Sequence, residues 1–88
     1  MDDGRPLRNF PDSYSIKAVG KDEDGFAEHA SAVVKSIVED KESVSHSVRA
    51  SRNGSYLSVT LNFTANSQEE LDSVFSTMSA EDRVIWVL

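Results

Sequence analysis

The residues of this chain that are best suited to binding chemistry surround one predicted turn. Asn53–Gly54 is a strong signal for a tight turn between antiparallel strands, and Arg49 and Arg52 stand beside it among hydroxyl side chains. Two guanidinium groups next to hydroxyls can hold a carboxylate or an acidic protein surface. Alternatively, Gly54 is present because the turn requires a positive φ, and the arginines only keep the tip of the hairpin soluble. The predicted ligand or partner site consists of Lys17, Arg49, Ser51, Arg52, Tyr56 and Ser58.

Neither the histidines nor the acidic run predicts a metal site. His29 and His46 fall in different predicted elements, and neither has a second ligand four residues away. We expect His29 to be a solvated or partly covered helix residue and His46 to be partly buried. Asp22–Gly25 resembles part of a calcium loop but lacks its alternating ligands and its late glutamate, so a helix cap explains it better. The chain has no cysteine. We therefore predict no metal and no cofactor.

The spacing of nucleophiles and phosphate-binding residues does not predict an enzyme. Gly20–Lys21 resembles the end of a phosphate-binding loop, but Asp22 occupies the hydroxyl position and the upstream glycine is missing. An acylphosphatase-like enzyme would need a cationic cradle after the first strand, where this chain has carboxylates. No serine lies in a G-x-S-x-G elbow. We therefore expect a noncatalytic protein.

The charge of the chain argues against polyanionic partners. A net charge of −6 repels nucleic acid and anionic membranes unless a local basic patch overrides it. RNA-recognition domains stack bases on aromatics of the first and third strands, where this sequence offers only Tyr56. The first two dozen residues contain charges and no apolar run, so we predict neither a signal peptide nor a membrane span and expect a cytoplasmic location.

Periodicity predicts four strands and two helices. Residues alternate between apolar and polar over the strands, whereas each helix has an apolar stripe of three- and four-residue spacing. The first helix is expected to start at the acidic run before Phe26, and Ser67 with Glu70 forms a capping-box pattern for the second. The predicted strands are 13–20, 43–50, 56–65 and 84–88, and the apolar stripes of the helices are 26–38 and 71–78.

Two amphipathic helices must cover one face of the sheet, and this predicts an α+β, ferredoxin-like βαββαβ sandwich with a four-stranded, mainly antiparallel sheet in the order 4-1-3-2. Residues 1–12 are predicted to be a tail, anchored by Phe10 and Pro11, and residues 13–88 one domain. The expected core is Ile16, Ala18, Val44, Val48, Leu57, Val59, Leu61, Phe63, Val84 and Trp86. The expected open face is Lys17, Val19, Arg49, Ser58, Thr60, Asn62, Ile85 and Val87.

Val19, Ile85 and Val87 could form an exposed apolar patch and hence an interface. The alternatives are that they are scattered surface residues or that Leu7 and Phe10 of the tail cover them. A homodimer, through the open face or an edge strand, is one arrangement that these patterns allow.

Several stretches of the sequence resemble the YbeD-like family of small bacterial domains of unassigned function. These stretches are Phe10–Pro11, Lys17–Gly20, Ser51–Val59 and Val87–Leu88, and the resemblance covers roughly residues 10–88. It implies a fold like that of ACT regulatory domains, and hence a domain that binds a small effector or regulates a metabolic enzyme. Together with the basic hairpin, we expect the partner to be a small acidic metabolite or a protein. Fold does not determine function. The alternatives are a protein–protein adaptor without a small ligand and an RNA-binding domain.

Overall fold

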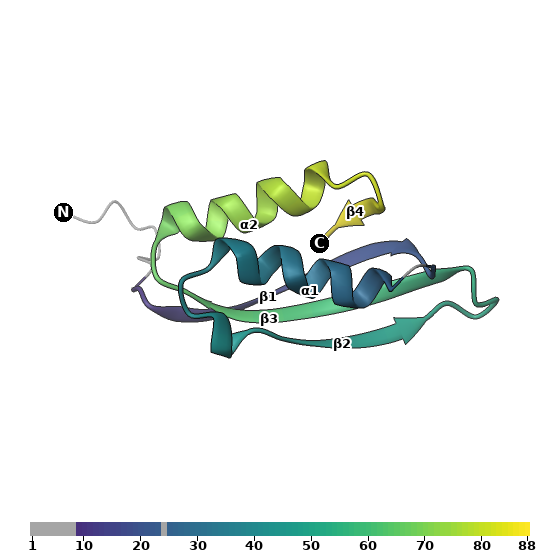
Figure 1. Cartoon of the computed structure of the whole chain (residues 1–88), viewed down its shortest axis with the longest axis horizontal. Coiled ribbons are helices and arrows are strands. Elements are labelled where there is room, and N and C mark those ends of the chain that lie inside the picture. The colour runs from purple at the N-terminus through teal and green to yellow at the C-terminus, as the bar shows by residue number, and fades with distance from the viewer. Residues whose placement is uncertain (1–8, 24) are drawn as a thin grey trace, which may run out of the picture.

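The computed structural model describes residues 9–23 and 25–88, which form a sheet covered by two helices on one side (Figure 1). In chain order, the elements are β1 (Asp12–Lys21), α1 (Phe26–Ile37), the 3-10 turn η1 (Lys41–Ser43), β2 (Ser45–Ala50), β3 (Tyr56–Ala65), α2 (Gln68–Ala80) and β4 (Val84–Val87). Residues 1–8 of the predicted tail lie outside the described residues, and Phe10 packs against the core.

The predicted fold is confirmed. The sheet order is β2-β3-β1-β4, and all neighbouring strands are antiparallel. The central pair, β1 and β3, matches ten residues in continuous register from Asp12↔Ala65 to Lys21↔Tyr56. Because strand side chains alternate between faces, this register fixes which residues point to the helices and which point away.

The core lies between the helices and the two central strands. Alternate residues of β1 and β3 are buried, and the apolar stripes of α1 and α2 pack on them. Burial of these side chains is the main stabilising contribution in a chain of this size. The largest fully buried side chains are Phe26, Phe63, Leu61, Met78, Val34, Val38, Val59 and Val74.

The two helices begin in different ways. The Ser67 half of the predicted capping box of α2 is confirmed, since the Ser67 side chain accepts a hydrogen bond of 3.1 Å from the backbone N–H of Glu70, while the reciprocal bond to the Glu70 carboxylate comes from Asn66 and not from Ser67. The Glu70 carboxylate accepts from the backbone N–H groups of Asn66 and Glu39 and so ties the segment after α1 to the start of α2. Among the described residues the expected acidic cap of α1 is not seen, because the N-cap is Gly25 in the left-handed region and forms no side-chain cap; Asp24 of the acidic run lies outside the described residues.

The predicted burial of β2 is wrong at two positions. Val48 is 53% exposed, and His46 is exposed as well, although both point to the helix side of the sheet. Figure 1 shows the reason: β2 is an edge strand, and α1 lies over β3 and leaves β2 largely uncovered. Val44, just before β2, packs against the core as predicted.

The predicted orientation of β4 is wrong because the strand contains a β-bulge. Val19 pairs with Trp86, but Gly20 pairs with Val84, so the pairing skips Ile85. Val84 and Val87 therefore both pack against the core, whereas Trp86 points to the open face and is 59% exposed. Strict alternation had placed Trp86 in the core and Val87 on the open face.

Gly20 is required where β1 meets both the bulge and the first helix. A Cβ at this position would lie 2.4 Å from the backbone oxygen of Arg83 and 2.7 Å from the Phe26 ring. The Arg83 guanidinium in turn lies over that ring, 5.7 Å from its centroid. Any side chain at Gly20 would push β4 and α1 apart.

We predict that Gly20→Ala lowers the free energy of unfolding by about 1–3 kcal/mol, because the added methyl overpacks a closed contact. Gly54→Ala is the matched control: nothing lies within 4 Å of its Cβ, so its cost, about 1 kcal/mol, arises from a φ of +77°. Urea unfolding followed by circular dichroism measures both. Gly54→Asn should recover stability because asparagine tolerates this φ, whereas a Gly20→Ala protein as stable as the wild type would contradict the packing described here.

Candidate functional site

The sheet face away from the helices, which we call the open face, is polar and cationic. Its basic strand residues are Lys17, Lys21 and Arg49, and no strand position on it carries an aspartate or a glutamate. Register assigns to the open face Ser13, Ser15, Lys17, Val19, Lys21, Ser45, Ser47, Arg49, Tyr56, Ser58, Thr60, Asn62, Thr64 and Trp86, and the paired backbones of Lys17 and Leu88 add Leu88.

A hollow of about 480 Å³ lies on the open face at the hairpin end, and we call it the arginine hollow. Five of the six predicted site residues line it, together with Val19. Lys17 does not line it and sits one row further along the sheet, opposite Thr60. The complete lining is Val19, Arg49, Ala50, Ser51, Arg52, Tyr56, Leu57 and Ser58.

The β2–β3 hairpin holds the two arginines in place. The Gly54 N–H donates to the Ser51 carbonyl, and the Ser51 N–H donates to the Tyr56 carbonyl at 2.8 Å. The Ser51 hydroxyl donates to Asn53 and accepts from the Tyr56 N–H. The donor of Ser51 is thus used inside the turn, and the donors left for a ligand are the guanidinium groups and the hydroxyls of Tyr56 and Ser58.

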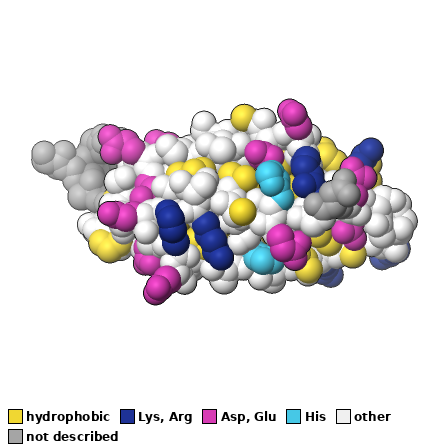
Figure 2. Space-filling view, viewed as in Figure 1, with side chains coloured by type: hydrophobic (Ala, Val, Ile, Leu, Met, Phe, Trp, Pro, Cys, Tyr) yellow, Lys and Arg dark blue, Asp and Glu magenta, His cyan; other side chains and the backbone are white. Residues whose placement is uncertain are grey.

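Neither guanidinium of the arginine hollow has a hydrogen-bond or ion-pair partner in the part of the chain that the structure describes. The carboxylates of the described residues sit on the helices, the connecting segments and the start of β1. Asp and Glu side chains are spread over the face shown in Figure 2, which includes both helices. The protein is therefore acidic overall but presents a locally positive surface, which attracts anions over a distance of about 8 Å at physiological salt.

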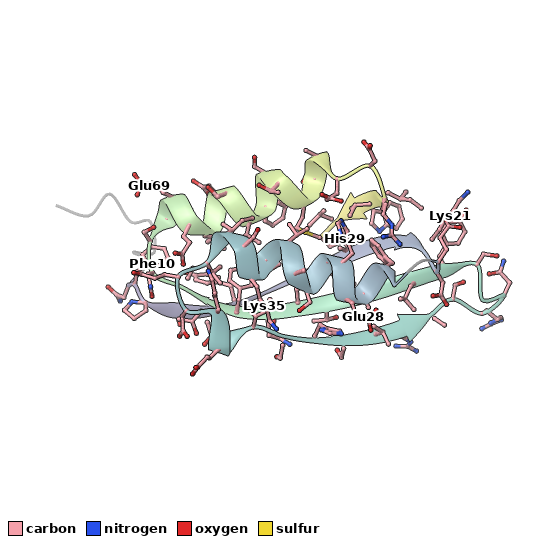
Figure 3. All side chains as sticks on the ribbon, viewed as in Figure 1. Phe10, Lys21, Glu28, His29, Lys35 and Glu69 are labelled. Atoms are coloured by element: carbon pink, nitrogen blue, oxygen red, sulfur yellow. The ribbon has the colours of Figure 1, made fainter. Side chains whose placement is uncertain are left out.

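Lys21 extends this positive surface at the same end of the molecule. It pairs with Tyr56 across β1 and β3, and Figure 3 shows it near the hairpin, at the opposite end from Phe10. Lys17 and Lys21 flank Val19 on the same strand face, each about 7 Å from it along the strand. The arginine hollow and the rows of the sheet beside it thus carry four cations, of which only the two arginines line the hollow itself.

An apolar strip borders the cationic region on the side of β4. Trp86 pairs with Val19, and Leu88 lies beside Lys17, with which it exchanges backbone hydrogen bonds of 2.8 and 3.0 Å. The predicted patch of Val19, Ile85 and Val87 is therefore wrong at Val87, and Trp86 and Leu88 belong to it instead. The sequence signal that could have revealed this is weak, because a bulge in a five-residue apolar run leaves no mark in its composition.

Other candidate chemistry is sparse among residues 9–23 and 25–88. No three histidine, cysteine, aspartate or glutamate side chains cluster as metal ligands there. His29 is part-buried and forms a hydrogen bond of 2.7 Å with Glu81, which joins α1 to the end of α2. No helix in the described part is long and apolar enough to cross a membrane.

Sequence comparison finds relatives along nearly the whole chain. A family model described as "Protein of unknown function (DUF493)" matches residues 5–88. A UPF0250 protein of Nitrosomonas europaea is 34% identical over 82 residues, which cover 93% of this chain and 94% of that protein. A UPF0250 protein of Azotobacter vinelandii is 36% identical, covering 94% of this chain and 91% of that protein. The resemblance to the YbeD-like family is thus confirmed.

Solved structures confirm the fold alone, because the sequence identities are low. The solution structure of a protein from H. pylori matches with a TM-score of 0.73 and 17% identity, covering 99% of this chain and 91% of that chain. The ACT domain of a GTP pyrophosphokinase from Chlorobium tepidum matches with a TM-score of 0.66 and 16% identity, covering 86% of this chain and 94% of that domain.

The exposed position of Trp86 makes a direct prediction, because it is the single tryptophan of the chain. We expect the folded protein to fluoresce like an indole in water, and acrylamide to quench it almost as efficiently as it quenches the urea-unfolded protein. A blue-shifted emission that is shielded from acrylamide would place Trp86 in the core and contradict the bulge in β4.

Proposed function

This chain belongs to the DUF493 family of proteins of unknown function, and on that premise we propose that it is a noncatalytic binding domain whose arginine hollow takes an anionic group. The ligand would be a small acidic metabolite or a carboxylate on a partner protein. The single observation that supports this is the presence of two arginines without partners among the described residues, in a hollow that no carboxylate lines.

The geometry of the hollow favours carboxylates over neutral ligands. Guanidinium groups form paired hydrogen bonds with carboxylates, and the hydroxyls of Tyr56 and Ser58 add further donors at the same place. Its volume of about 480 Å³ lies within the range of small-molecule sites. The positive potential of the open face would raise the local concentration of anions before binding.

The lining of the hollow supports binding rather than catalysis. It contains hydroxyl groups as the only nucleophiles and no histidine or carboxylate that could act as their general base. The ACT-like fold is also found as one domain of an enzyme, the GTP pyrophosphokinase of Chlorobium tepidum. We propose that the domain acts in the cytoplasm by binding a metabolic protein, its small acidic effector, or both.

We predict that citrate, used as a tricarboxylate probe, binds the wild-type protein at low salt and that Arg49→Ala and Arg52→Ala each weaken this binding about tenfold, which is about 1.4 kcal/mol. Isothermal titration calorimetry measures the affinities. Lys35→Ala is the matched control, since it removes one exposed cation from α1, on the other side of the sheet.

Equal losses for Arg49→Ala and Lys35→Ala would mean that citrate responds only to net charge. A wild-type protein that binds neither citrate nor succinate would rule out the small-metabolite form of the proposal, and the protein-adaptor form would then be the one to pursue by affinity capture.

Single-stranded RNA is a second candidate, because the structure turns Trp86 to the same face as Tyr56. Two exposed aromatics among four cations could stack bases and bind phosphates. If this candidate is right, RNA 12-mers shift in a gel at low salt, and the logarithm of affinity falls against the logarithm of salt with a slope of about −2 to −3, as expected for three or four phosphates. Trp86→Ala should abolish the shift. Absence of any shift at low salt would remove this candidate.

A further inference from the structure

The sequence of the edge strand β2 predicts that one of its faces is covered, but the described residues of the single chain leave that face exposed. Its residues Ser45–Ala50 alternate in the way that is typical of a strand with one covered face. All six are nevertheless exposed, and Val48 on the helix side has 53% of its surface in contact with solvent. The sequence of β2 is therefore suited to a partner that covers this strand.

The outer edge of β2 is also open to backbone pairing. Because Ser51 bonds to Tyr56 and antiparallel ladders alternate, the backbone groups of Ser47 and Arg49 point to β3, and those of His46, Val48 and Ala50 point away from the sheet. Natural edges are usually protected by lysine, proline, a bulge or a very short strand. β2 has six residues in unbroken register with β3 and contains neither proline nor lysine, and its one charged residue, Arg49, points to the open face.

The helix layer leaves space beside this edge. A hollow of about 410 Å³ lies between α1 and β2, and its apolar lining includes Phe26, Ala27, Val48 and Leu57. Glu28 lines the same hollow from α1 and is labelled in Figure 3. A strand added to β2 would bring its own helix-side residues next to this apolar floor.

We propose that the partner is a second copy of this chain, whose β2 pairs antiparallel with the first about a two-fold axis at Val48. In this register Val48 lies opposite Val48 of the second copy, and His46 lies opposite Ala50. All three residues that direct backbone groups outward then find partners, and the two sheets join into one of eight strands. The two exposed valines cover each other.

Charge favours this arrangement over other contacts between two copies. Across the axis, Arg49 lies opposite Ser47 of the second copy, so no like charges face each other directly. Pairing of two open faces would instead bring together two surfaces that each carry Lys17, Lys21 and Arg49. Pairing through β2 also leaves the open side of the arginine hollow accessible, and the proposal does not depend on what that hollow binds.

The absence of cysteine in the natural chain allows a clean test by disulfide cross-linking. In the proposed register, the two Cα atoms of residue 48 lie about 5.5 Å apart, within disulfide range, so Val48→Cys should give a covalent dimer under mild oxidation. The controls are His46→Cys and Ser47→Cys, which are also exposed but do not meet their own copies. We expect their yield to be at least about tenfold lower, while a mixture of His46→Cys and Ala50→Cys proteins should cross-link.

Equal yields at positions 46, 47 and 48, or no dimer at position 48, would overturn the proposal. Sedimentation equilibrium gives an independent measurement on the natural chain. It should show a dimer that Val48→Lys weakens at least tenfold and Val48→Thr retains, because only lysine places like charges opposite each other. A wild-type protein that remains monomeric up to millimolar concentration would also overturn it, and circular dichroism of each variant confirms that the monomers fold.

Discussion

The antiparallel pairing of β1 with β3 determines almost everything else in this structure. Ten residue pairs in unbroken register place one set of side chains under the helices and the other set on the open face. Because the side-chain period of a strand is two, a slip by one residue would exchange the faces and bury lysine where Ala18 now packs. The positions of Lys17, Lys21, Tyr56 and Ser58 relative to one another are consequences of this ladder.

The same ladder separates the charges of the molecule. Four of the seven basic residues of the described chain, Lys17, Lys21, Arg49 and Arg52, lie on the open face or the hairpin, whereas its acidic residues lie on the helices, the connections and the start of β1. This separation lets an acidic protein keep an anion-attracting surface. It also bears on assembly, because a positively charged face is a poor place for self-association, and the edge of β2, whose single basic residue Arg49 points to the open face, is a better one.

Most of the fold could be predicted from the sequence, because each element has a strong local signal. Alternation in β1 and β3, the Asn53–Gly54 turn and the Ser67 cap all matched their predicted roles. Five of the six predicted site residues meet in one hollow for the same reason, since all five belong to a hairpin whose register the turn sets. Lys17 was predicted to join them because it points to the open face. It does point there, but it lies one row of residue pairs beyond the hollow.

The errors arose where burial and orientation depend on distant parts of the chain. Trp86 was expected in the core because alternation cannot reveal the bulge at Ile85, which depends on how β4 meets β1 near Gly20. Val48 was expected in the core because its strand alternates, but whether a helix covers an edge strand depends on the packing of the whole helix layer. In β4 the bulge interrupts the alternation of side chains between the two faces. In β2 the alternation is intact, but no helix of the same chain covers Val48.

The central claim is that the open face at the hairpin end is where this domain meets an anionic ligand. An amide NMR titration with citrate tests it most directly, because every residue of the sheet reports its own surroundings. The account predicts that the largest shift changes fall on Val19, Arg49 to Arg52 and Tyr56 to Ser58. Changes centred on the start of α1 or on the helix layer, with the hairpin amides unmoved, would contradict it.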